Sequence, residues 1–363
     1  MRHAVKANFR RAISSRTILS CTTLVHAIFR GTIAASFLIY AAVEVQAQTA
    51  IDDVHIIARA KPMEVASAAY AANSVKRDAV MSGSLIRTSV ELVMVPVSIT
   101  DDYHRPVLGL DQGNFQLFEG KKRQEIKNFS SEDTPISVGI IIDTSGSMSY
   151  KLERAREAVA EFCEQANPAD EYFLITFADT PRLETDFTNS PAQIENDLLT
   201  VRSKGTTSLL DAIDMGLKKM KQARYGRKAL LILSDGGDNH SRHTERAVKS
   251  AIKETDVMIY AVGTYDRYVA TQEELLGPEL LRTVTSLTGG QAYTLTNEND
   301  LPKVTRRIGI QLRHQYVLAY QPQSAQHDGK WRKVSVKLRL PKPFRFLHVD
   351  ARPGYYAGYA GGE

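Results

Sequence analysis

The chain has 363 residues, of which 43% are hydrophobic and 24% are charged, with 22 glycines and 13 prolines. This composition is typical of a globular protein and excludes a fibre or a disordered tail. The formal net charge is +5, but residues 1–47 hold six of the 46 bases and one of the 41 acids, so the rest of the chain carries 40 of each. A body without net charge has no electrostatic footprint for a polyanion, and we expect no nucleic-acid partner.

Residues 1–47 have the features of an export signal. A basic stretch that ends at Arg30 precedes the apolar run Thr32–Val43, and Val45 and Ala47 supply small residues for a cleavage site. The apolar run is shorter than the roughly 20 residues that a membrane-spanning helix needs. We therefore predict a cleaved signal peptide and an exported protein, which would be periplasmic, cell-envelope or secreted. The alternative is an uncleaved N-terminal anchor, which would provide the only membrane contact.

The next segment, residues 48–88, is predicted to be a linker. It is rich in alanine and serine and has no sustained apolar period. Removal of the signal would leave Cys163 as the sole cysteine. An internal disulfide is then impossible, and Cys163 is expected to pack as a small apolar side chain.

Strand patterns occur in two blocks that flank the middle of the chain. In the first block, residues 93–99 alternate as a half-buried strand, and Phe115–Phe118 and Gln124–Phe129 are predicted to form a β-hairpin around Gly120. In the second block, strands are predicted at residues 315–320, 333–340 and 344–349.

Each block alone holds about three strands, which is few for an independent sheet. We therefore expect residues 89–131 and 313–358 to pair as the two halves of one β-sandwich. Residues 359–363 would form a tail.

The middle of the chain, residues 132–312, alternates short apolar runs with helical patterns, as in βαβ units around a parallel sheet. Continuous apolar runs predict strands buried on both faces at residues 136–142, 172–177, 229–233 and 257–262. Apolar spacing predicts helices at residues 152–166, 209–220, 244–254, 279–287 and 301–312. The expected fold class is α/β, with a doubly wound, mostly parallel sheet flanked by or inserted into the all-β sandwich.

Three oxygen-rich loops are expected at the carboxyl edge of this sheet, where ligands bind in open α/β folds. They are Asp143-Thr144-Ser145-Gly146-Ser147, Gly205-Thr206-Thr207-Ser208 and Ser234-Asp235-Gly236. Together they offer two carboxylates and several hydroxyls but no histidine or cysteine. Such ligands suit Mg²⁺, Mn²⁺ or Ca²⁺ rather than zinc.

With these residues, the middle of the chain resembles a von Willebrand factor type A domain with a metal-ion-dependent adhesion site. The family pattern is Asp-x-Ser-x-Ser, then a threonine in a glycine-rich loop, then an aspartate before glycine. Asp143, Ser145, Ser147, Thr207 and Asp235 match these positions in order. Flanking segments such as VPVSITDD and LRHQYVLAY further resemble the VWFA-related family of exported bacterial proteins.

The resemblance implies a divalent cation, with Mg²⁺ favoured and Mn²⁺ or Ca²⁺ as alternatives. Ser145, Ser147 and Thr207 would be direct or near-direct ligands, and Asp143 and Asp235 would bind directly or through water. An acidic side chain of a protein partner would complete the coordination. Thr206 and Ser208 flank Thr207 and also carry hydroxyls. The sequence therefore leaves the position of the ligand in this loop open by one residue in either direction.

Other readings of the same residues compete with an adhesion site. The chain could be a structural envelope protein with a vestigial metal site, or a metal-dependent hydrolase in which Asp143 is a nucleophile. We expect no enzyme, because phosphatases of that type carry a second carboxylate two residues on, where this chain has Ser145. The common nucleophile-elbow, Walker and metalloprotease motifs are also missing from the sequence.

Two weaker features have competing interpretations. His240 and His243, near Asp238, could form a second metal site, but a solvated loop is favoured. Tyr355, Tyr356 and Tyr359 are either an aromatic contact patch or the end of a strand with a frayed tail.

The export signal gives a first testable prediction. We expect the mature chain to begin near Gln48, because the small residues before it form a signal-peptidase site. Mass spectrometry of the protein from its native host would measure the N-terminus. An intact Met1 in a cytosolic fraction would contradict the prediction.

Overall fold

The computed structural model describes residues 92–235, 237–265, 272–322, 328–340 and 346–357. The predicted export signal and linker, together with Gly236 and Tyr359, lie outside the described residues. No helix within the described ranges is long and apolar enough to cross a membrane.

A six-stranded sheet in the order β10-β9-β8-β5-β6-β7 forms the centre of the α/β part. Its strands are β5 (Ser137–Asp143), β6 (Glu171–Phe177), β7 (Pro181–Thr188), β8 (Lys228–Ser234), β9 (Met258–Thr264) and β10 (Ala292–Leu295). Neighbouring strands are parallel except β6 and β7, which are antiparallel. Every residue of β5 is buried, as expected for a parallel strand covered on both faces.

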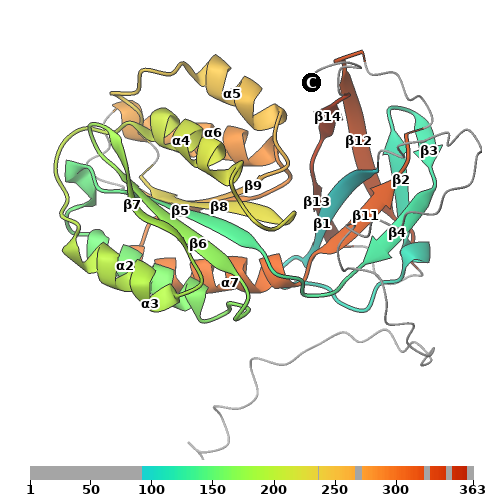
Figure 1. Ribbon diagram of the computed structural model, residues 1–363, viewed down its shortest axis with the longest axis horizontal. Helices are drawn as coiled ribbons and strands as arrows, with labels where there is room; N and C mark the ends of the chain where they lie inside the picture. The colour runs from blue at the N-terminus through green and yellow to red at the C-terminus, as the bar shows by residue number, and fades with distance from the viewer. Residues whose placement is uncertain (1–91, 236, 266–271, 323–327, 341–345, 358–363) are drawn as a thin grey trace, which may run out of the picture. The chain divides into compact units, whose positions relative to one another are not determined.

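Helices cover both faces of this sheet (Figure 1). One face carries α2 (Leu152–Cys163), α3 (Pro191–Thr200) and α7 (Leu301–Arg313), and the other carries α4 (Leu209–Met220), α5 (Glu245–Lys253) and α6 (Gln272–Ser286). Successive β5 side chains alternate between the two cores, so Ile140 packs under α2 and Ile141 under α4. The doubly wound, mostly parallel sheet predicted from the sequence is confirmed.

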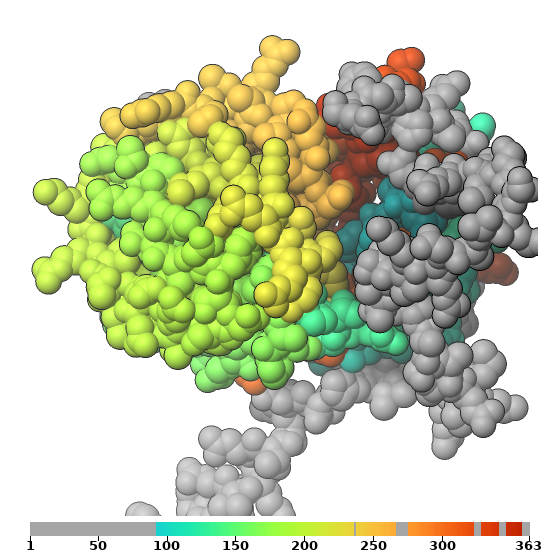
Figure 2. Space-filling model, in the orientation of Figure 1, coloured from blue at the N-terminus to red at the C-terminus, as the bar shows by residue number. Residues whose placement is uncertain are grey.

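In the space-filling view, the visible face of this part is mostly green to gold (Figure 2). Cys163 is a free, buried cysteine in the core under α2 and α7, as predicted for a small apolar side chain.

The flanking strands form two four-stranded sheets, β13-β1-β11-β4 and β14-β12-β2-β3. Their bounds are β1 (Val93–Asp101), β2 (Phe115–Glu119), β3 (Lys122–Gln124), β4 (Ile126–Ser130), β11 (Tyr316–Tyr320), β12 (Trp331–Leu338), β13 (Leu347–Ala351) and β14 (Gly354–Tyr356). β1 pairs with β11 and β13, and β2 pairs with β12, all antiparallel. The predicted pairing of the two β blocks is therefore confirmed.

The predicted hairpin is correct only for its first half. β2 turns into β3 around Gly120, which has φ +58°, but the expected strand Gln124–Phe129 is broken at Glu125. β3 stays beside β2, whereas β4 joins β11 in the other sheet. Gln124 and Ile126 are both buried, so the sequence pattern continues across the break and gives no sign that the chain changes sheets.

Several elements were absent from the sequence prediction because their residues are largely exposed or the segments are short. They are β7, α3 and β10. For β14 the sequence indicates a strand end at Tyr355 and Tyr356 as one of two interpretations, and the structure has a strand there. The prediction for α6 also began too late, at Glu279. The helix continues through Pro278, and Leu275 and Leu276 before it are 68% and 64% exposed, so apolar spacing could not reveal this turn.

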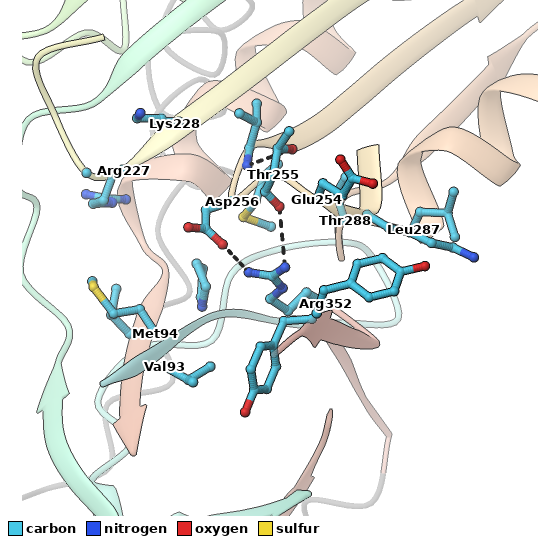
Figure 3. A pocket seen from close by; sticks show the side chains of 18 of the residues that line it. Val93, Met94, Arg227, Lys228, Glu254, Thr255, Asp256, Leu287, Thr288 and Arg352 are labelled. Carbon is cyan, nitrogen blue, oxygen red and sulfur yellow. Dashed lines mark hydrogen bonds and ion pairs between the residues drawn. The ribbon is translucent and has the colours of Figure 1, made fainter. Parts of the chain in front are cut away.

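Polar side-chain contacts join the sandwich strands to the α/β part. Gln315, just before β11, donates from Nε2 to the Tyr260 hydroxyl at 3.1 Å and to Ser98 Oγ at 3.3 Å. The Arg352 guanidinium points to the Asp256 carboxylate and the Thr255 carbonyl, beside a cleft of about 750 Å³ (Figure 3). These contacts link β1, β11 and the end of β13 to β9 and the segment before it.

The centre of the sheet leaves no room for a methyl group at Gly139. A Cβ there would lie 2.2 Å from Phe173 Cζ and 2.5 Å from Leu230 Cδ2, on the two neighbouring strands. We expect Gly139→Ala to lower the free energy of unfolding by about 1–3 kcal/mol or more, because overpacking a dense core strains it. Urea denaturation measures the effect.

Gly113→Ala is the matched control, since a Cβ at Gly113 would meet nothing within 4 Å. The prediction fails if the two variants are equally stable.

Candidate metal centre

The first loop of the centre begins where β5 ends. The Asp143 side chain is fully buried, and its carboxylate accepts hydrogen bonds from the Ser145 backbone N–H at 2.8 Å and from Ser234 Oγ at 2.6 Å. Burial and the neighbouring Asp235 carboxylate raise the pKa of Asp143 to about 7, against the effect of the hydrogen bonds from Ser145 and Ser234. A buried carboxylate with a second one beside it is stabilised by a cation.

Two serine hydroxyls follow Asp143, one just before and one within a short 3-10 turn, Gly146–Met148. The Ser145 and Ser147 Oγ atoms lie 3.0 Å apart. Ser145 is buried and Ser147 is half-buried, so the pair extends from the carboxylate towards solvent. This spacing places two oxygen atoms that could be metal ligands next to each other.

The second loop is fastened to the first by backbone hydrogen bonds. The Gly146 N–H donates to the Gly205 carbonyl at 3.0 Å, and the Lys204 N–H donates to the Thr144 carbonyl at 2.8 Å. Gly205 has φ +99°, a conformation that favours glycine. The two loops therefore lie side by side at the carboxyl edge.

The second loop distinguishes its two threonines. Thr206 is exposed, and its Oγ1 donates to Asp179 Oδ1 at 2.6 Å. Thr207 is buried, and its backbone N–H donates to Asn239 Oδ1 at 3.0 Å. Since the Thr206 hydroxyl is held by Asp179, the geometry favours Thr207 as the hydroxyl available to a cation.

The third loop brings the second carboxylate. Asp235 follows β8 and is 1% exposed, and within the described part of the chain its Oδ2 has no hydrogen-bond partner. Lys151 Nζ lies 3.7 Å from that oxygen and donates instead to the Thr264 carbonyl at 2.9 Å. The Asn239 N–H donates to the Thr207 carbonyl, so the third loop is also tied to the second.

The three loops thus converge as the sequence predicted, but three contributors were missed. The sequence pattern includes Ser234 only as part of its loop, and it does not distinguish Asn239 or Lys151. A serine before Asp235 could have suggested a donor to Asp143. Nothing in the sequence distinguishes Lys151, just before α2, from a surface lysine, because its burial depends on β9 closing over it.

The donor set fits a hard divalent cation. Two buried carboxylates stand with serine and threonine hydroxyls, and in the described structure one carboxylate oxygen accepts no hydrogen bond. Mg²⁺, Mn²⁺ and Ca²⁺ prefer such oxygen ligands. Among the described residues, no group of three or more His, Cys, Asp or Glu side chains is placed to hold a metal. His243 lies beside Asp211, with Nδ1 2.7 Å from Oδ1, and His240 is exposed.

Comparison with known proteins agrees with this arrangement. Residues 138–237 match the family profile of the von Willebrand factor type A domain. The chain is 24% identical over 194 residues to inter-alpha-trypsin inhibitor heavy chain H4 of Bos taurus, a match that covers 49% of this chain and 20% of the bovine protein. It thus spans about a fifth of that relative's length.

Solved structures similar to this chain include two from bacteria. A von Willebrand factor type A protein from Catenulispora acidiphila has 12% identity and a TM-score of 0.45, covering 75% of each chain. The conserved hypothetical protein BatB from Bacteroides thetaiotaomicron has 17% identity and a TM-score of 0.40, covering 48% of this chain and 98% of its own.

The match over residues 138–237 includes β5 from its second residue onward and all three loops. This chain therefore contains a von Willebrand factor type A domain.

Proposed function

We propose that the chain is an exported binding protein that holds one divalent cation, with Mg²⁺ as the favoured ion, and presents it to an acidic group of a protein partner. Ser145, Ser147 and Thr207 would hold the cation, with Asp143 and Asp235 as direct or water-mediated ligands. The proposal assigns to these five residues the metal-binding roles of the adhesion-site pattern of type A domains.

One observation carries the proposal. Asp235 Oδ2 is buried without a hydrogen-bond partner in the described structure, next to the buried carboxylate of Asp143. A buried charged oxygen that accepts no hydrogen bond costs free energy, and a cation between the two carboxylates would offset the part of that cost that the Lys151 ammonium, 3.7 Å away, does not. The hydroxyls of Ser145 and Ser147 supply neutral ligands without adding negative charge.

The bound ion would supply a Lewis-acidic position that an incoming carboxylate can occupy. The chain's own residues prepare that position. Ser234 and the Ser145 N–H orient Asp143, and Asn239 fixes the Thr207 backbone, so the donors are held before a partner arrives. Ser147, which is half-buried, lies on the side open to solvent.

A binding role is favoured over the other two functions. A hydrolase with Asp143 as nucleophile would need an acid/base group nearby, and the hydroxyl of Ser145 stands where its second carboxylate would be. A vestigial site would not need an ordered network of side-chain contacts around two buried carboxylates. The export signal predicted from the sequence at residues 1–47 is consistent with a place outside the cytoplasm.

Metal titration tests this proposal. We expect wild-type protein to bind Mg²⁺ or Mn²⁺ with modest affinity, and Asp143→Ala and Thr207→Ala to lose measurable binding. In chelator, Asp143→Ala should change the free energy of unfolding by no more than about 1–2 kcal/mol, because a lost hydrogen-bond acceptor is offset by lost repulsion. Calorimetric titration and urea denaturation measure the two effects.

Thr206→Ala is the matched control, since its hydroxyl faces Asp179, and it should bind metal within about tenfold of wild type. Captures from envelope extract with Mg²⁺ and with chelator then test partner binding. Equal partner binding by wild type, Asp143→Ala and Thr207→Ala under both conditions would show that the site is not the working surface.

A further prediction concerns the loop that carries Thr207. Gly205→Ala would force a side chain into φ +99° and place a Cβ 2.7 Å from Asp179 Oδ1. We expect a strain of about 1–3 kcal/mol, which the loop relieves by moving, and at least about a tenfold loss of Mn²⁺ affinity.

Gly146→Ala in the adjoining loop is the control for Gly205→Ala. Its Cβ would lie 3.6 Å from the Gly205 carbonyl oxygen, an ordinary contact, so metal affinity should be nearly unchanged. Equal Mn²⁺ affinities for the two variants would show that the position of this loop does not control the site.

A further inference from the structure

Lys151 is a buried cation beside the candidate metal centre. Its side chain is 4% exposed, and Nζ lies 3.7 Å from Asp235 Oδ2. Nζ donates to the Thr264 carbonyl at 2.9 Å and lies 5.3 Å from the centre of the Tyr150 ring. The ammonium is thus held by the end of β9 and by its sequence neighbour, close to one carboxylate without being hydrogen-bonded to it.

The position of Lys151 changes the charge count of the centre. The formal charges of two ionised carboxylates and one divalent cation sum to zero. With the Lys151 ammonium included, the centre carries one net positive charge. Charges in a buried site interact much more strongly than charges in water. The extra positive charge of Lys151 would therefore affect the affinity of the metal-loaded centre for its next ligand. An incoming carboxylate would neutralise the loaded centre with Lys151 present and would make it negative without Lys151.

The Lys151 charge has the opposite effect on metal binding, which it weakens. A fixed ammonium beside Asp235 already offsets part of the negative charge that attracts a divalent ion, and it repels that ion. The centre is therefore built to bind metal less tightly and an anion more tightly than its five candidate ligands alone would.

We propose that Lys151 is a specificity-determining residue of this centre, which weakens binding of the metal alone and makes the loaded centre select an anionic ligand. This inference rests on the proposed metal-dependent function. It assigns to Lys151 an electrostatic role without making it a metal ligand.

Mn²⁺ alone is the first probe, with free Mn²⁺ measured by electron paramagnetic resonance. Lys151→Met removes the charge at similar length, and Lys151→Gln removes the charge but keeps a donor for the Thr264 carbonyl. Both variants should bind Mn²⁺ at least about tenfold more tightly than wild type. Lys303→Met, which removes an exposed lysine from α7, is the charge-matched control and should bind as wild type does.

Acetate is the second probe, as a simple carboxylate added to Mn²⁺-loaded protein. Its binding can be followed by the relaxation of water protons on Mn²⁺, since an entering carboxylate displaces a bound water. Acetate should bind the two Lys151 variants at least about tenfold more weakly than wild type. The opposite directions of the metal and acetate effects separate an electrostatic role from simple damage to the fold.

A stability measurement in chelator needs no bound metal. Lys151→Met should lower the melting temperature, because it leaves Asp235 buried without a cation, and should lower it much less in an Asp235→Asn background. Equal losses in the two backgrounds would overturn the charge coupling between Lys151 and Asp235. If Lys151→Met does not fold in chelator, Lys151→Gln carries the same comparison.

The outcomes separate this inference from the proposed function. Equal Mn²⁺ affinity for wild type and both Lys151 variants would overturn the role of Lys151 and leave the metal site standing. Mn²⁺ binding by the variants but not by wild type would support the role of Lys151 and refute a native metal site. Absence of Mn²⁺ binding in every protein would overturn both.

Discussion

The burial of β5 at the centre of the six-stranded sheet determines most of what surrounds it. β5 runs between β6 and β8 with both faces covered, so its last residue, Asp143, enters the carboxyl edge as a fully buried carboxylate. A charge in that position is costly unless hydrogen bonds or a nearby positive charge compensate it. Ser145, Ser234 and the neighbouring loops are arranged around this requirement.

The pairing of β5 with β8 brings a second charge to the first. Because the two strands are parallel neighbours, Asp235, just after β8, stands beside Asp143. Their repulsion raises the pKa of Asp143 and makes the pair unfavourable without positive charge nearby. Lys151 gives part of that charge from inside the fold, and the proposed cation would give the rest.

Polar side chains attach the sandwich to β9 and to the segment before β9, away from the edge of the sheet that carries the candidate metal centre. Gln315 joins Tyr260 of β9 to Ser98 of β1, all of them buried, and Arg352 is held by Asp256 and a carbonyl. The buried polar network around Gln315 requires a defined geometry, because an unsatisfied member is costly. The sandwich is thereby fixed at the ends of strands away from the candidate metal centre.

The sequence by itself determined the α/β class, the long buried strands, most helices and the five candidate ligands. Continuous apolar runs and helical spacing report burial directly, and Asp143, Ser145, Ser147, Thr207 and Asp235 form a pattern that is visible along the chain. It also indicated that the two β blocks pair, since neither holds enough strands alone.

Only the tertiary structure decided which side chains are buried beside which. The chain crosses between the two sandwich sheets at Glu125, and the hydrophobic pattern of the sequence does not show it. The exposed helical turn before Pro278 leaves no periodic signal either. The difference between Thr206 and Thr207 arises from Asp179, which lies 27 residues away from Thr206 in the chain. Lys151 resembles any surface lysine in the sequence, and it becomes part of the centre because β9 covers it, which is a consequence of long-range packing.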